Sequence, residues 1–104
     1  MQDKRRHPRV TVNLAISCEL NKGGTFPGVL VDLSMGGAFV GAETVPVFGA
    51  ELTIVASLPG APNVRVPAIV RWSKPGGFGV QFGLIGARET HALSILVHGS
   101  SSRS

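Results

Sequence analysis

The chain has 104 residues, a length that allows one domain with a single core and excludes two. Apolar residues make up 43% and charged residues 15%, which excludes a disordered chain, and no apolar run reaches the roughly 18–20 residues of a membrane-spanning helix. Most of the net charge of +4 lies in residues 1–9, which carry four cations and one anion, whereas residues 10–104 carry six cations and five anions. We therefore expect a flexible basic arm, 1–9, in front of a nearly neutral body, 10–98.

Strand periodicity dominates the body. From Val10 to Leu20, apolar and polar residues alternate strictly over eleven positions, which predicts a half-buried strand. Turn residues follow at Asn21–Gly24. Later strands are predicted at Gly28–Leu33, Gly37–Val40, Glu51–Leu58, Val64–Ser73 and through Phe78, Val80 and Phe82, with a loop at Pro59–Asn63 and a hairpin turn at Lys74–Gly77.

The periodicity changes near the C-terminus. Ala87–Val97 places Leu93, Leu96 and Val97 on one side, which predicts an amphipathic helix that ends near Gly99 and is followed by a disordered tail, 99–104. Short antiparallel strands at roughly ten-residue spacing are typical of a closed or nearly closed sheet. The predicted fold is therefore all-β, a small antiparallel barrel of six to seven strands with a C-terminal α-helix.

The arm carries the sequence KRRHPR at Lys4–Arg9. Pro8 disfavours a helical conformation at His7, so we expect an extended or turned segment. The fork of an arginine can donate two parallel hydrogen bonds to guanine O6 and N7 or to two phosphate oxygens. The arm therefore predicts an anionic partner of limited size, although a solvated tail is the simpler interpretation of such a cluster taken alone.

A second motif, DLSMGG at Asp32–Gly37, follows a predicted strand. On a strand Asp32 and Ser34 would share one face outside the core, since residues two apart point the same way. The carboxylate could accept hydrogen bonds from guanine N1–H and the exocyclic amine, and Gly36 and Gly37 would allow a tight turn with close approach of the backbone. A turn closed by local side-chain to backbone bonds is the structural alternative.

With both motifs the chain resembles the PilZ domain family. Arg5-x-x-x-Arg9 is similar to the RxxxR motif of that family, and Asp32-x-Ser34-x-x-Gly37 is similar to its (D/N)xSxxG motif. The resemblance extends over about residues 4–97, including the GGAFV run at Gly36–Val40 and VRWSKPGGFGVQF at Val70–Phe82.

This resemblance implies a PilZ-like barrel that binds cyclic di-GMP, a bacterial second messenger with two guanines and two phosphates. Arg5 and Arg9, assisted by Arg6, would bind guanine acceptor edges and phosphates, and Lys4 would favour an intercalated pair of ligands over a single one. Binding would order the arm and signal to an unidentified effector protein. The implied ligand-binding residues are Lys4, Arg5, Arg6, Arg9, Asp32, Ser34, Gly36 and Gly37.

Other residues receive structural interpretations. Trp72 shares the parity of Val66 and Val70, so we expect it in the core, whereas Arg65 and Arg71 should face outward. Cys18 lies on the apolar face and predicts a small core residue. The lone cysteine and the absence of an apolar run after the basic N-terminus predict a cytoplasmic protein without a signal peptide.

No arrangement of catalytic residues is visible, and His91 and His98 have no acidic or cysteine neighbours that suggest a metal site. The sequence therefore predicts a binding module, not an enzyme, with no cofactor or metal. Two alternatives stay open: a PilZ-like protein-interaction scaffold without nucleotide binding, and a basic-armed nucleic-acid binder, which the confinement of charge to the arm disfavours.

Overall fold

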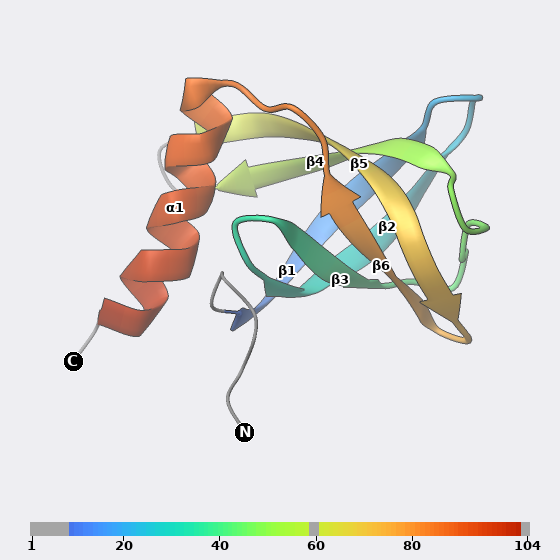
Figure 1. The fold of residues 1–104 in the computed structure, drawn as a ribbon, viewed down its shortest axis with the longest axis horizontal. Coiled ribbons are helices and arrows are strands. Elements are labelled where there is room, and N and C mark those ends of the chain that lie inside the picture. The colour runs from blue at the N-terminus through green and yellow to red at the C-terminus, as the bar shows by residue number, and fades with distance from the viewer. Residues whose placement is uncertain (1–8, 59–60, 103–104) are drawn as a thin grey trace.

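The computed structural model describes residues 9–58 and 61–102, with the backbone alone for residues 99–102. Lys4, Arg5, Arg6 and the rest of the predicted arm before Arg9 lie outside the described residues. The described chain forms six strands and one helix (Figure 1). Their bounds are Val10–Leu20 (β1), Thr25–Leu33 (β2), Gly37–Gly41 (β3), Glu51–Leu58 (β4), Ala61–Lys74 (β5), Gly77–Phe82 (β6) and Ala87–Ser102 (α1).

The six strands form a closed antiparallel barrel in the order β1-β2-β3-β6-β5-β4, with β4 pairing back onto β1. Alternate side chains of each strand fill its interior, where Phe26 and Phe78 meet edge to face at 6.1 Å between ring centroids. The predicted small antiparallel barrel with a C-terminal helix is therefore confirmed. The largest fully buried side chains are Phe78, Leu33, Leu52, Val40, Val64, Val70, Val97 and Cys18.

Several predicted boundaries are wrong by a few residues. β2 begins at Thr25, because Phe26 pairs with Cys18 and adds a buried ring to the core. β5 begins at Ala61, inside the predicted Pro59–Asn63 loop, because Ala61 is buried opposite Leu58. The predicted hairpin turn shortens to residues 75–76, since its outer residues pair with each other in β5 and β6.

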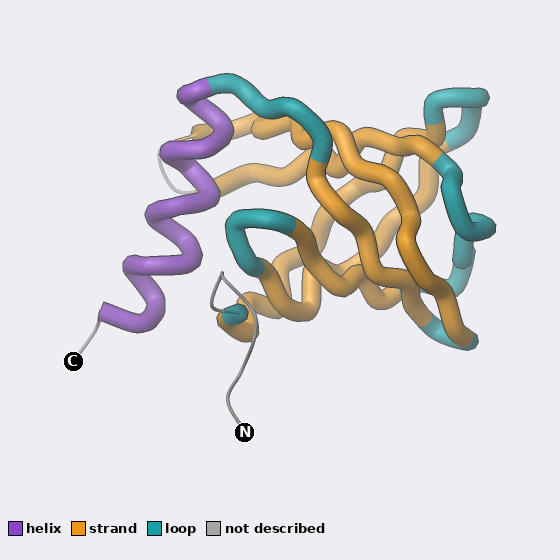
Figure 2. The backbone as a smooth tube through the Cα atoms, viewed as in Figure 1, coloured by secondary structure: helices purple, strands orange, loops and turns teal. Residues whose placement is uncertain are grey.

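α1 lies across one end of the barrel (Figure 2) and packs against β5 and β1. Ala92, Leu93 and Val97 are buried in this contact, which confirms the predicted apolar face. The helix continues through Gly99 to Ser102, so the predicted end at Gly99 is wrong and residues 99–102 of the predicted tail are helical. Within the described residues, α1 is too short and too polar to span a bilayer.

Four register shifts interrupt the strand pairings of the described barrel. A β-bulge places one extra residue on a strand, so that two of its residues oppose one on the neighbour. The shifts occur between Thr11 and Leu14 of β1, between Leu30 and Asp32 of β2, between Ala56 and Leu58 in the pairing of β4 with β5, and between Val70 and Trp72 of β5. The shifts at Leu30–Asp32 and at Val70–Trp72 decide the geometry of the site described below.

Cys18 is fully buried on the inner face of β1, as predicted. Burial raises the pKa of its thiol from 9.0 to about 11, because desolvation disfavours the thiolate. We expect the native protein to resist alkylation by iodoacetamide at mildly alkaline pH and the urea-unfolded chain to react readily, since the thiolate is the reactive form.

The same pKa difference predicts a stability change. The unfolded chain loses the Cys18 proton above pH 9 whereas the folded chain keeps it to about pH 11, so the free energy of unfolding falls as pH rises through this interval. Urea titrations across this range should show a component of the fall that Cys18→Ala lacks. Rapid alkylation of the native protein would contradict the buried position of the thiol.

Candidate functional site

Asp32 occupies the outer face of β2, as predicted. Its neighbours across the sheet are Thr11 on β1 and Phe39 on β3. Because the β2 bulge separates Leu30 from Asp32, Leu30 and Leu33 both face the core while the carboxylate between them points out with its side chain 29% exposed. The bulge thus presents one acidic group on an otherwise apolar stretch of strand.

Arg9 lies immediately before β1 and brings the two sequence motifs together. Its Nη1 donates to Oδ1 of Asp32 at 3.0 Å across 23 residues of chain, and its side chain is 34% exposed. An exposed pair of this kind contributes only about 0–1 kcal/mol to stability. Its main consequence is geometric, since it holds the last arginine of one motif beside the first residue of the other.

Ser34 does not share a face with Asp32, so this part of the prediction is wrong. Ser34 follows the end of β2 and is buried, and its backbone N–H donates to the Gly37 carbonyl at 2.9 Å. The Ser34 hydroxyl donates to the same carbonyl and accepts from the Gly36 N–H, both at 3.3 Å. The locally bonded turn, the structural alternative above, therefore describes this residue.

Gly37 is required by the packing of β3 against β6. A Cβ at this position would lie 2.3 Å from the backbone oxygen of Val80, and real Cβ atoms do not approach backbone so closely. The neighbouring Gly36 carbonyl accepts from the Phe82 N–H at 3.0 Å. The predicted close backbone approach is confirmed at Gly37, and its immediate cause is the adjacent strand.

Trp72 lies outside the barrel, 46% exposed, so its predicted place in the core is wrong. The bulge in β5 is the reason: Val70 pairs with Val80 and Trp72 pairs with Gly79, which leaves both Arg71 and Trp72 outside. A Cβ on Gly79 would lie 2.2 Å from the indole Nε1, so the ring lies directly against the glycine backbone.

Phe39 and Trp72 form what we call the aromatic platform. Their ring centroids are 5.4 Å apart and their planes differ by 13°. Phe39 rests on Gly77 as Trp72 rests on Gly79, because a Cβ on Gly77 would lie 2.3 Å from the Phe39 ring. Two outward glycines of β6 thus make room for two rings from neighbouring strands, which produces a flat apolar surface of the kind on which a nucleobase stacks.

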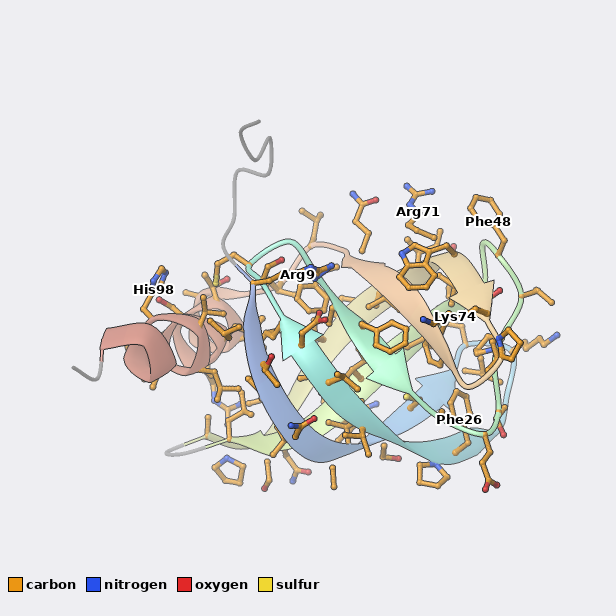
Figure 3. The ribbon with its side chains drawn as sticks, turned by 90° about the horizontal axis from the view of Figure 1, so that it is seen from below. Arg9, Phe26, Phe48, Arg71, Lys74 and His98 are labelled. Carbon is orange, nitrogen blue, oxygen red and sulfur yellow. The ribbon has the colours of Figure 1, made fainter. Side chains whose placement is uncertain are left out.

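Cations and polar groups border the platform. The Lys74 ammonium lies 5.3 Å from the Phe39 ring centroid and 6.0 Å from that of Trp72, which is within range of a cation–π contact. Arg71 Nε donates to Gln81 Oε1 at 2.8 Å. Figure 3 shows Arg9, Arg71 and Lys74 around this part of the barrel.

The ion pair and the platform adjoin each other, because Phe39 is the cross-strand neighbour of Asp32. The face therefore combines a carboxylate acceptor, guanidinium and ammonium donors, and a stacking surface. These are the groups needed to bind a purine together with an attached anion.

Sequence periodicity missed the platform, although the sequence contains a signal for it. If β5 and β6 are paired residue by residue outward from the turn at Pro75 and Gly76, Trp72 lies opposite Gly79. Gly79 faces out because Phe78 and Val80 face in, so this pairing places Trp72 outside. Strand alternation continued from Val70 places the indole inside instead, and such a disagreement by one residue indicates a bulge.

Other residues within the motifs and on the outer faces lie elsewhere or have structural roles. Met35, between Ser34 and Gly36, is partly buried against the core. Arg65 pairs with Glu19 away from Asp32, and this hydrogen bond and charge raise the pKa of the guanidinium. His91 and His98 are exposed on α1. Among the described residues, no group of three or more His, Cys, Asp or Glu side chains is placed to hold a metal ion.

Comparisons with known proteins identify the fold. The PilZ domain family model matches residues 3–97. The PilZ domain of CeSA from a cellulose-synthesizing bacterium is similar at 22% identity with a TM-score of 0.73, over 90% of this chain and 98% of that chain. The PilZ domain of YcgR from Escherichia coli, solved with c-di-GMP, is similar at 18% identity and a TM-score of 0.71, over 93% of this chain and 91% of that chain.

A third similar structure is the PlzA protein of Borreliella burgdorferi in complex with c-di-GMP, at 17% identity and a TM-score of 0.69. The match covers 91% of this chain and 41% of PlzA. A search of curated proteins gave no significant match. Since the family model covers almost the whole sequence and the barrel is shared, the chain belongs to the PilZ domain family.

Proposed function

We propose that this protein binds cyclic di-GMP on the face that carries Asp32 and acts as a receptor for this second messenger. The observation that carries the proposal is the 3.0 Å ion pair between Arg9 and Asp32, because it joins the two motifs that the family uses. The YcgR and PlzA structures, which are similar to this chain, contain c-di-GMP, and this supports the choice of ligand.

In the proposed complex the Asp32 carboxylate accepts hydrogen bonds from guanine N1–H and the exocyclic amine. Arg9 turns its fork from the carboxylate toward a guanine acceptor edge or a phosphate. The exposed face of Trp72 stacks on a purine, and the Lys74 ammonium and Arg71 guanidinium lie near the platform to neutralise phosphate charge. Ser34, Gly36 and Gly37 shape the turn beside this surface.

The arm completes the proposed site. Lys4, Arg5 and Arg6 would contribute the remaining cations, and Lys4 favours an intercalated pair of ligands over a single one. Ligand binding then fastens the arm against the barrel and alters the surface offered to an effector protein in the cytoplasm. The proposed protein is a binding module rather than an enzyme, and its signal passes through a partner chain.

A fluorescence titration tests this function directly, because Trp72 is the only tryptophan and the chain has no tyrosine. We expect c-di-GMP to change the Trp72 emission at low micromolar concentration, with GMP and GTP far weaker, and calorimetry to give the same affinity and the ligand number. Arg9→Ala should weaken binding by roughly tenfold or more, since it removes a charge-assisted donor.

Two results would contradict the proposal. Absence of c-di-GMP binding by calorimetry would leave the protein-interaction scaffold as the better interpretation. Binding that depends steeply on salt and does not prefer the cyclic dinucleotide would favour a nucleic-acid binder instead. The Trp72→Phe variant serves as the optical control, because it should lose the fluorescence signal while keeping a ring on which a purine can stack.

A further inference from the structure

An exposed apolar group lies at the end of the barrel away from α1. Val47 and Phe48, in the segment between β3 and β4, are 73% and 66% exposed. They border a hollow of about 370 Å³ whose other walls include Leu20 and Ala50. Figure 1 shows the β3–β4 segment and the β1–β2 turn together at this end, opposite the helix. Exposed side chains of this size beside a receiving hollow are typical of interaction surfaces.

Backbone hydrogen bonds hold this segment in place. The Gly49 N–H donates to the Val70 carbonyl at 2.8 Å, and the Val70 N–H donates to the Ala50 carbonyl at 2.9 Å. A third bond, from the Ala50 N–H to the Val47 carbonyl, closes the turn at 3.1 Å. Because the backbone on both sides of Phe48 is bonded, the ring is presented by an ordered turn rather than by a loose loop, and little ordering entropy is lost when it is covered.

The rim of the hollow carries one charge of each sign. Lys22 and Glu51 are both exposed and both line it, together with Asn21, whose Nδ2 donates to Glu51 Oε1 at 3.3 Å. Within the described part of the chain, Lys22 takes part in no ion pair. The surface therefore combines the exposed Phe48 ring with a hollow beside it. Its rim carries the Lys22 ammonium, which has no ion-pair partner among the described residues, and the Glu51 carboxylate, whose side-chain partner is the neutral amide of Asn21.

We propose that this surface binds a second copy of the same chain across a two-fold axis. A two-fold interface places one patch against itself, so the patch must contain its own complement. Here Phe48 of each copy would enter the hollow of the other, and Lys22 of each copy would face Glu51 of the other. Because each rim carries one charge of each sign, two facing rims can pair opposite charges twice.

The position of the N-terminal arm supports the same occupant. The hollow lies beside Leu20 at the end of β1, whereas the arm enters at its start, and an eleven-residue strand extends up to roughly 35 Å. A dimer formed at this end therefore keeps apart the starts of its two β1 strands and the basic segments that precede them. A stable interface buries roughly 800 Å² per partner, whereas this surface offers two large exposed apolar side chains, Val47 and Phe48, so we expect a weak, reversible dimer.

Sedimentation velocity on the full chain without nucleotide tests the dimer independently of the proposed function. The wild type should shift from monomer to dimer as concentration rises, and Phe48→Ala should raise the dissociation constant at least about tenfold. Leu84→Ala is the matched control, because Leu84 is 97% exposed but does not line the hollow, and it should dimerise as the wild type does.

Charge reversal tests the two-fold arrangement itself. Lys22→Glu and Glu51→Lys should each be monomeric alone, because each places like charges together twice, whereas an equimolar mixture of the two variants should form a heterodimer. A wild type that stays monomeric up to ~1 mM overturns the proposal, as does a Phe48→Ala variant that dimerises normally. A mixture that fails to associate while the wild type does overturns the proposed pairing of the rim charges.

Discussion

Asp32→Ala is expected to lower the affinity for c-di-GMP by about 100-fold, while the barrel keeps nearly its full stability. The substitution removes the carboxylate that can accept two N–H bonds and leaves the facing guanine donors unpaired; alanine is chosen because asparagine also satisfies the (D/N)xSxxG motif and keeps one acceptor oxygen. Leaving charged or polar partners unpaired in a binding site costs about 2–5 kcal/mol, which corresponds to a factor of this size. The wild-type ion pair is exposed, so little stability is lost with it.

Glu19→Ala provides the matched control for this experiment. It breaks another exposed pair between an arginine and a carboxylate, Arg65–Glu19, on a part of the barrel away from Asp32. Calorimetry should therefore give wild-type affinity for Glu19→Ala and greatly weakened binding for Asp32→Ala. If Asp32→Ala bound within threefold of the wild type, the carboxylate would not be the acceptor and the proposed site would be wrong.

Gly37→Ala is expected to lower the free energy of unfolding by about 1–3 kcal/mol, the usual cost of forcing atoms into filled space. The new methyl group would lie 2.3 Å from the Val80 carbonyl oxygen, so β3 or β6 must move to accommodate it. In a domain of this size each kcal/mol lowers the melting temperature by roughly 4–8 °C, so calorimetric melting measures the effect readily.

Gly83→Ala is the control for that substitution. Its added methyl group would meet Pro67 at 3.7 Å, an ordinary contact, so its melting temperature should stay close to that of the wild type. Equal melting temperatures for the two variants would show that the strands separate at no cost. The prediction therefore assigns Gly37, the last glycine of the motif, primarily to the packing of β3 against β6.

The sequence predicted the barrel because its signal repeats along many residues. Strict alternation from Val10 to Leu20 survives in the burial of β1, and the outward position of Asp32 follows from the burial of Leu33 next to it. The location of a strand is predicted from the alternation of apolar and polar residues over its whole length, so one irregular residue changes it little. A boundary error of a few residues, as at Thr25 or Ala61, does not alter which strands pair.

Side-chain directions at the site were less predictable, because they depend on single residues that interrupt the repeat. Ser34 falls just after the last residue of β2, where hydrogen bonds within the turn determine its direction. Trp72 follows a bulge, so the parity that holds from Val64 to Val70 no longer applies to it. Arg9 and Asp32 are 23 residues apart in the sequence, so no local pattern predicts the hydrogen bond between them. Lys4, Arg5 and Arg6 lie outside the described residues, so their roles remain predictions.

The extra residue in β5 has a consequence for comparing this chain with its relatives. Opposite Gly79, the strand presents two outward side chains, Arg71 and Trp72, where a regular strand would present one. A relative that lacks one residue at this point would still place the same side chains in the core, but it would lack the counterpart of either Arg71 or Trp72. A one-residue gap at this point of an alignment therefore marks a change in the binding face, whereas the same gap in a regular strand would turn core side chains outward.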